Sequence, residues 1–111
     1  MPSFAEVLEG DLVTSVSSDI ASRTFKIRIG TLTRVITIRV SKRRGPHGRF
    51  EYTASHAIRT PEQLGPYLSS IPFGDTPEEA LAKAIDDLTI FYSVGVRAGH
   101  EPDESWLVRR R

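Results

Sequence analysis

One stretch of the chain, residues 75–92, has the hydrophobic periodicity of an amphipathic helix. Its apolar side chains recur three and four positions apart, along one helical face: Leu81, Ala84, Ile85, Leu88, Phe91 and Tyr92. A start signal precedes them, since Thr76 is a favourable N-cap residue, Pro77 suits the first helical position and Glu79 completes a Thr-x-x-Glu capping box. A helix with such a face needs a surface on which to pack.

Alternating apolar residues upstream of the helix predict a β-meander. In residues 24–29 the apolar side chains are at odd positions, and in residues 32–40 they are at even positions. Directly opposed residues of an antiparallel pair share a face, so joining an odd set to an even set requires a loop with an even number of residues. The simplest is a two-residue turn at 30–31, which places Phe25 opposite Ile36.

A third strand is predicted after the loop 43–47. Its apolar positions, beginning with Phe50, are even like those of the strand before it, so the connecting loop has an odd number of residues. The register that follows places Val40 opposite Phe50 on the apolar face. It also places Arg39 opposite Glu51 on the solvent face, where opposite charges attract.

These elements predict an α+β fold in which a three-stranded antiparallel meander packs on one long C-terminal helix. A weak alternation over 11–17 gives a fourth strand as an alternative, and a capping pattern at 3–6 gives a short N-terminal helix as a second one. Gly95 and Gly99 mark the end of the long helix. The 111 residues are expected to form a single domain, 1–111, with 100–111 as a candidate flexible tail.

Basic residues are concentrated in the predicted meander, although the net charge of the chain is only +1. Residues 20–50 contain no Asp or Glu, and their basic residues are Arg23, Lys26, Arg28, Arg34, Arg39, Lys42, Arg43, Arg44 and Arg49. Acidic residues are concentrated on the predicted helix. We therefore expect an electrically two-sided molecule whose basic side attracts an acidic partner. The alternative is that these cations only keep the sheet solvated.

The candidate partner-binding surface combines a cationic hairpin tip at 42–49 with cations on the solvent face of the sheet. Its residues are Lys26, Arg28, Arg39, Lys42, Arg43, Arg44 and Arg49. Lys and Arg in such an arrangement can neutralise several phosphates, but no aromatic residue lies between them to stack on bases. The sequence predicts a small non-enzymatic binding module whose partner is an acidic macromolecule, either nucleic acid or an acidic protein surface.

The sequence contains no recognisable catalytic, metal-binding or cofactor-binding motif. The three histidines lack metal-ligand spacing, and His56, on the apolar side of the third strand, is expected to be a packed structural residue. There is no cysteine and no glycine-rich phosphate loop, so we predict no cofactor and no enzymatic activity, with an enzyme of unknown class as the remote alternative. No apolar run approaches the roughly 20 residues needed to cross a bilayer, so we expect a cytoplasmic protein without a membrane partner.

Residues 73–84, FGDTPEEALAKA, resemble the GDT-x-EEAL-x-x-A passage of the HicB-type antitoxin domain, which also follows a small antiparallel sheet. The resemblance covers this stretch and the β-β-β-α order of elements. It implies a partner-binding domain, so a protein-interaction module of the antitoxin or inhibitor type is the alternative function. An exposed edge strand, either 23–29 or the third strand, also makes a homodimer a candidate assembly.

Overall fold

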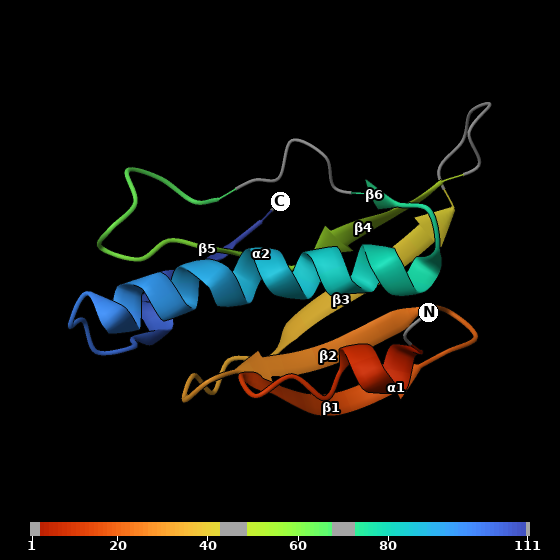
Figure 1. Ribbon diagram of the computed structural model, residues 1–111, viewed down its shortest axis with the longest axis horizontal. Coiled ribbons are helices and arrows are strands. Elements are labelled where there is room, and N and C mark those ends of the chain that lie inside the picture. Colours follow the sequence, from red (N-terminus) through yellow and green to blue (C-terminus); the bar gives the residue numbers. More distant parts are fainter. Residues whose placement is uncertain (1–2, 43–48, 68–72, 111) are drawn as a thin grey trace.

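A five-stranded antiparallel sheet forms the centre of the computed structural model, which describes residues 3–42, 49–67 and 73–110 (Figure 1). Its strands, in spatial order, are β1 (Val13–Asp19), β2 (Thr24–Ile29), β3 (Ile36–Lys42), β4 (Phe50–Ala54) and β6 (Phe73–Gly74). The α+β class is as predicted, but the sheet has five strands rather than three or four, because β1 is a full strand and the short β6 pairs with β4. β2 lies between β1 and β3, so the prediction that it is an edge strand is wrong.

One face of the sheet is covered by α2 (Pro77–Arg97), which crosses β3 and β4 in Figure 1. The helix begins as the sequence predicts, because the Thr76 side chain accepts a hydrogen bond of 3.1 Å from the Glu79 backbone N–H. The Glu79 carboxylate in return accepts one of 2.9 Å from the backbone N–H of Asp75. Two backbone donors at the start of the helix are thus satisfied by side chains. The second is the N–H of Asp75, one residue before the N-cap, where a standard capping box would use the N–H of Thr76.

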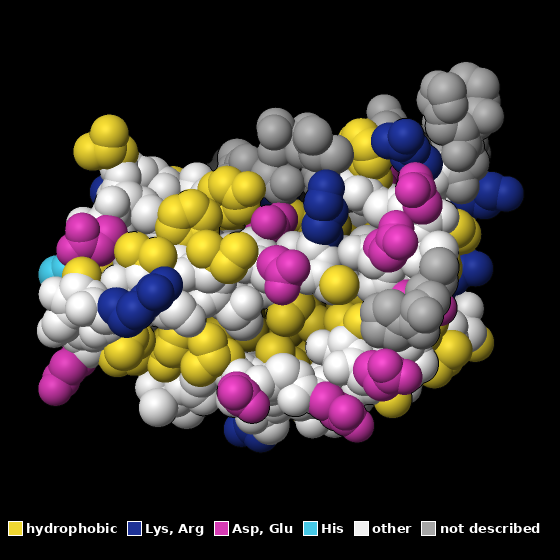
Figure 2. Space-filling view, viewed as in Figure 1, with side chains coloured by type: hydrophobic (Ala, Val, Ile, Leu, Met, Phe, Trp, Pro, Cys, Tyr) yellow, Lys and Arg dark blue, Asp and Glu magenta, His cyan; other side chains and the backbone are white. Residues whose placement is uncertain are grey.

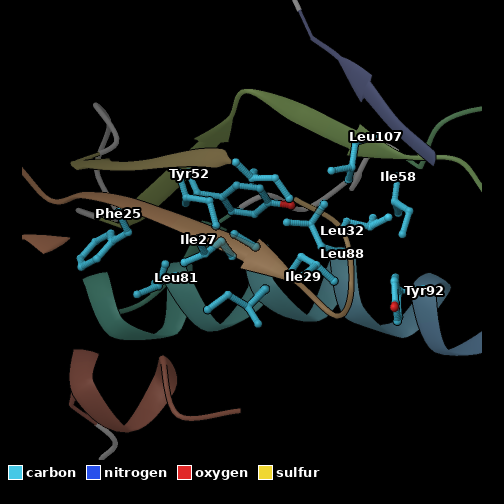
Figure 3. Close-up of a cluster of buried hydrophobic side chains, with 14 of the residues drawn as sticks. Phe25, Ile27, Ile29, Leu32, Tyr52, Ile58, Leu81, Leu88, Tyr92 and Leu107 are labelled. Carbon is cyan, nitrogen blue, oxygen red and sulfur yellow. The ribbon is translucent and has the colours of Figure 1, made fainter. Parts of the chain in front are cut away.

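The hydrophobic core lies between the sheet and α2 (Figure 3). Its largest fully buried apolar side chains include those at alternate positions of β2 and β3: Phe25, Ile27, Ile29, Ile36 and Ile38. A single helical turn, α1 (Phe4–Val7), adds to this core, and its Phe4 ring lies 4.9 Å, centroid to centroid, from that of Phe25. The residues between the buried positions point away from the core, so Lys26 and Arg28 are exposed as the parity argument predicts.

Both hairpin registers differ from the prediction by two residues. Phe25 lies opposite Ile38 instead of Ile36, so the β2–β3 connection spans residues 30–35 instead of 30–31. In the second hairpin Val40 lies opposite Tyr52. Arg39 lies opposite Thr53, so the predicted Arg39–Glu51 pair does not form. A shift of two keeps every side chain on its predicted face, because side chains alternate with a period of two.

Contacts with distant parts of the chain hold the longer β2–β3 connection. The Tyr92 hydroxyl on α2 accepts a hydrogen bond of 3.2 Å from the Thr31 backbone N–H. The Glu104 carboxylate accepts hydrogen bonds from the backbone N–H groups of Thr33 and Arg34, at 3.0 and 2.9 Å. Leu32 is buried between these anchors. A two-residue turn would forgo all of these contacts, and they join residues about 60 to 70 positions apart, which local pattern cannot reveal.

A second, two-stranded sheet pairs β5 (His56–Ile58) with β7 (Leu107–Arg109). A short 3-10 helix, η1 (Glu104–Trp106), directly precedes β7, so residues 104–109 of the expected tail form regular structure. Trp106 is 4% exposed, and its ring lies edge-on to that of Tyr92 at a centroid distance of 5.7 Å. The three-residue strands of this sheet are too short to show periodicity, so the sequence pattern does not predict it.

Gly95 does not end α2, contrary to the prediction. The helix continues to Arg97, Ala98 caps it, and Gly99 follows with a φ of +93°. Gly95 is buried because Trp106 packs directly on it, and a Cβ atom there would lie 2.9 Å from Cη2 of the indole. Its role is therefore close packing, whereas Gly99 provides the left-handed conformation after the helix.

Candidate functional site

The sheet face that points away from α2 carries three of the predicted cations, and we call it the outer face. We define it by the outward side chains of β1 to β4: Thr14, Ser17, Asp19, Thr24, Lys26, Arg28, Thr37, Arg39, Ser41, Glu51 and Thr53. Lys26 lies opposite Thr37, and Arg39 lies opposite both Thr24 and Thr53. Lys26 and Arg28 are two positions apart on one strand, so their Cα atoms are about 7 Å apart. The three cations form a compact group surrounded by hydroxyl side chains.

These cations are not neutralised by the rest of the described structure. The two ion pairs among residues 3–42, 49–67 and 73–110 are Arg49–Asp75 and His100–Glu62, and neither involves Lys26, Arg28 or Arg39. The acidic members of the outer face, Asp19 and Glu51, belong to β1 and β4, on either side of the cations. The exposed guanidinium and ammonium groups are therefore available to an anionic ligand.

The remaining predicted site residues lie elsewhere. Lys42 is exposed at the end of β3, but it pairs with Phe50 and so has the parity of the core face. Arg49 is 3.4 Å from the Asp75 carboxylate and lies 5.6 Å from the centroid of the Phe73 ring, so its charge already has a partner. Arg43 and Arg44 lie outside the described residues. The structure thus groups Lys26, Arg28 and Arg39 and separates them from Lys42 and Arg49.

A concavity of about 310 Å³ opens on the outer face where β4 ends. Its lining consists of Thr37, Arg39, Thr53, Ala54, Ser55 and Arg110. Arg110 is held there by the β5–β7 pairing and by a 2.9 Å hydrogen bond from its backbone N–H to the Ser55 carbonyl. Arg110 is not among the predicted site residues, because it lies more than 50 positions from Ser55 and no local pattern links the two. The available signal was the run of three arginines at residues 109–111.

Ser55 and His56 stabilise the bend between β4 and β5. The Ser55 hydroxyl accepts a 2.8 Å hydrogen bond from the Thr37 backbone N–H and lies 2.7 Å from His56 Nδ1, to which it can donate its proton. Burial, together with the charges of Arg34 and Arg109, lowers the pKa of His56 below its ordinary value of 6.5. The neutral ring is therefore favoured, and His56 is the packed structural residue that the sequence predicts.

The opposite side of the molecule, formed by α2, is acidic. Figure 2 views this side and shows Asp and Glu side chains over the N-terminal half of the helix, with some Lys and Arg side chains on the same side and a cluster of hydrophobic side chains beside the C-terminal half. The acidic residues of α2 are Glu78, Glu79, Asp86 and Asp87. Desolvation and the adjacent Asp87 carboxylate raise the pKa of Asp86, while Asp87 accepts a hydrogen bond from the Tyr52 hydroxyl on β4. The grouped cations of the outer face and the acidic residues of α2 thus lie on opposite sides. Each side also carries two charges of the other sign, Asp19 and Glu51 on the outer face and Lys83 and Arg97 on α2.

Comparison of the chain with protein-family models, with curated proteins and with solved structures gives no match. Among the described residues, no three His, Asp or Glu side chains are close enough together to hold a metal ion. The helices of the described part of the chain are too short or too polar to span a bilayer. The chemistry that the outer face can perform is the binding of anions by guanidinium, ammonium and hydroxyl donors.

Proposed function

We propose that this protein is a non-enzymatic binding module that contacts the phosphate backbone of a nucleic acid through its outer face. The observation that carries the proposal is the exposed group of Lys26, Arg28 and Arg39, unpaired and bordered by Thr and Ser side chains. Lys, Arg, Ser and Thr are the side chains that most protein–DNA contacts to phosphate oxygens use. Protein-binding hot spots instead depend on buried aromatic and Arg anchors, and β1 to β4 place no aromatic residue on the outer face. Phe73 of β6, opposite Glu51, has the same parity, but its ring lies against Arg49 at the far end of the sheet from Lys26 and Arg28.

The arrangement supports contact with several phosphates and little reading of bases. Lys26 and Arg28 are about 7 Å apart along β2, and Lys26 and Arg39 are diagonal neighbours at about 7–8 Å. These separations resemble those between successive phosphates of one strand. Single-stranded binding would need aromatic side chains for base stacking, so a duplex is the favoured ligand. Asp19 and Glu51 repel phosphates on both sides and restrict the contact to the central strands.

The test is fluorescence anisotropy with a labelled duplex of mixed sequence at several salt concentrations. About four phosphate contacts, from the three cations and Arg110, predict a slope of about −3.6 in log affinity against log salt. Each single Gln substitution at Lys26, Arg28 or Arg39 should make the slope shallower by about 0.9. The matched control is Arg97→Gln on α2, which removes one exposed positive charge from the opposite side. Affinity that is flat with salt, or an equal loss in the control, overturns the proposal.

A second candidate is the protein-interaction module that the HicB resemblance implies. The observation that favours it is the outer edge of β1, which among the described residues pairs with β2 alone and is exposed over residues 14–19. An extended segment of a partner, or a second copy of the chain, can add to such an edge through backbone hydrogen bonds. A β-bulge between Ser15 and Ser17 interrupts the pattern and limits the length of such pairing. A partner protein that stays bound after nuclease treatment and at high salt would favour this candidate over the first.

A further inference from the structure

We propose that the concavity at the end of β4 is a binding site for a single phosphate group. The inference rests on the proposed function only in taking nucleic acid as the source of that phosphate. The site is formed by Thr37 and Arg39 of β3, Thr53 of β4, and Arg110, which directly follows β7. Ser55 lines it as well but has a structural role.

The four donor side chains have no partners within the described structure. No hydrogen bond or ion pair joins the side chains of Arg39, Arg110, Thr37 or Thr53 to any residue of 3–42, 49–67 or 73–110. The Ser55 hydroxyl differs, because it already accepts the Thr37 N–H and faces His56 Nδ1. Arg39, Arg110, Thr37 and Thr53 therefore line one concavity, and their side-chain donors are free within the described structure. Phosphate oxygens are the acceptors that such donors bind most strongly.

The backbone positions of these donors are set before any ligand arrives. Arg39 and Thr53 are directly opposed in the β3–β4 ladder. Thr37 and Ser55 are joined twice, through the Ser55 hydroxyl at 2.8 Å and through the Ser55 N–H to the Thr37 carbonyl at 2.8 Å. Arg110 is tied to Ser55 by its own N–H. Because only side-chain rotamers need to be ordered, binding costs less conformational entropy than in a mobile loop.

Charge distinguishes this concavity from the larger one at the β6 end of the sheet. That second concavity, of about 380 Å³, is lined by Arg49 and Lys83 but also by Asp75 and Glu79. Arg49 is already paired with Asp75, so an anion there would meet two carboxylates. The lining of the first concavity contains no carboxylate. The local charges therefore favour an anion at the end of β4. Arg49, which lines the other concavity, serves as an internal control.

Two arginine charges favour a terminal phosphate over an internal one. A phosphomonoester carries a charge of about −1.5 to −2 at neutral pH, whereas a diester carries one negative charge. A monoester also presents three terminal oxygens, enough for a contact to each guanidinium and to a hydroxyl. We therefore assign the site to the terminal phosphate of a nucleic-acid strand, with an internal phosphate as the weaker ligand.

The first test is a titration of the intact protein with inorganic phosphate, monitored by the chemical shifts of the backbone amides. Chloride salt keeps the ionic strength constant throughout. We expect saturable changes at Thr37, Thr53 and Ser55, with a dissociation constant on the order of 1 mM, because the site is open to water. Arg39→Gln and Arg110→Gln should each weaken binding by about fivefold or more. Arg49→Gln should leave it unchanged. Changes that do not saturate, or that are equally reduced by Arg49→Gln, overturn the site.

The second test compares duplexes with and without a 5′-terminal phosphate. The wild type should bind the duplex with the 5′-phosphate more tightly, and Arg110→Gln should remove that preference. Arg28→Gln should weaken the binding of both duplexes by the same factor. Saturable binding of inorganic phosphate without any duplex binding would uphold the site and refute the proposed function. Salt-dependent duplex binding without a preference, in which Arg110→Gln acts like Arg28→Gln, would refute the site and leave the proposed function standing. Far-ultraviolet circular dichroism of each variant checks that it is folded.

Discussion

Replacing Gly95 by Ala in α2 tests whether the C-terminal segment packs where the structure places it. In a solvent-exposed helix this substitution stabilises by about 1 kcal/mol, because Gly has the poorer helix propensity. In this protein the added Cβ would lie 2.9 Å from Cη2 of Trp106 and 3.2 Å from Cβ and Cγ2 of Thr60. Carbon atoms make their best contacts at about 3.5–4.0 Å, so the indole must move away from the helix.

The overpacking should exceed the gain in propensity. Inserting a methyl group into a well-packed site costs about 1–3 kcal/mol, and Trp106 has little freedom because it is buried between Gly95 and Tyr92. We expect a net destabilisation of about 1 kcal/mol, which lowers the melting temperature by on the order of 5 °C. The measurement is urea denaturation followed by the fluorescence of Trp106, the single tryptophan, and by circular dichroism.

A double-mutant cycle tests whether contact with Trp106 causes the destabilisation by Gly95→Ala. Trp106→Phe removes the outer ring that contains Cη2, so in that background Gly95→Ala should become neutral or stabilising, with a coupling of about 1–2 kcal/mol. Gly99→Ala is the matched control, because nothing lies within 4 Å of its added Cβ and its cost comes only from the φ of +93°. That cost, about 1 kcal/mol, should be the same in both backgrounds. If Gly95→Ala stabilises the wild-type chain by the full propensity difference, Trp106 does not pack on the helix.

Three further predictions concern single side chains. Because the pKa of His56 is lowered in the folded state, the unfolded state takes up a proton first as the pH falls below about 6.5, and the free energy of unfolding should decrease there. His56→Gln should make this decrease smaller. A pH dependence that is unchanged in the variant would contradict the assignment. Backbone N–H groups of the β2–β3 connection lower the pKa of Glu104 below its ordinary value of 4.5. Glu104→Gln should therefore lower the melting temperature at pH 7, and the difference should vanish as the pH falls through that lowered pKa. Tyr92→Phe removes the acceptor of the Thr31 N–H and should cost about 0.5–1.5 kcal/mol, with faster hydrogen exchange at the Thr31 amide as the local sign.

Local pattern was sufficient for the faces of the sheet and for the start of the helix. The alternation of apolar residues assigns Phe25 and Ile27 to the core and Lys26 to solvent, and the structure agrees. This assignment is robust because it depends only on parity, which a register shift of two leaves unchanged. The capping residues Thr76 and Glu79 act within four positions of each other, so they too can be recognised from sequence.

Register, strand number and the site at the end of β4 were decided by tertiary structure alone. The β2–β3 connection is long because Tyr92 and Glu104 bond to its backbone, and nothing in residues 24–40 records those partners. Arg110 likewise lines the same concavity as Arg39 only because β7 pairs with β5. The physical reason is one of range: periodicity and capping arise from neighbours a few residues apart, whereas these features arise from atoms that only the folded chain brings together. The chain by itself thus determines which side of the sheet is cationic, and the fold determines which of its cations meet.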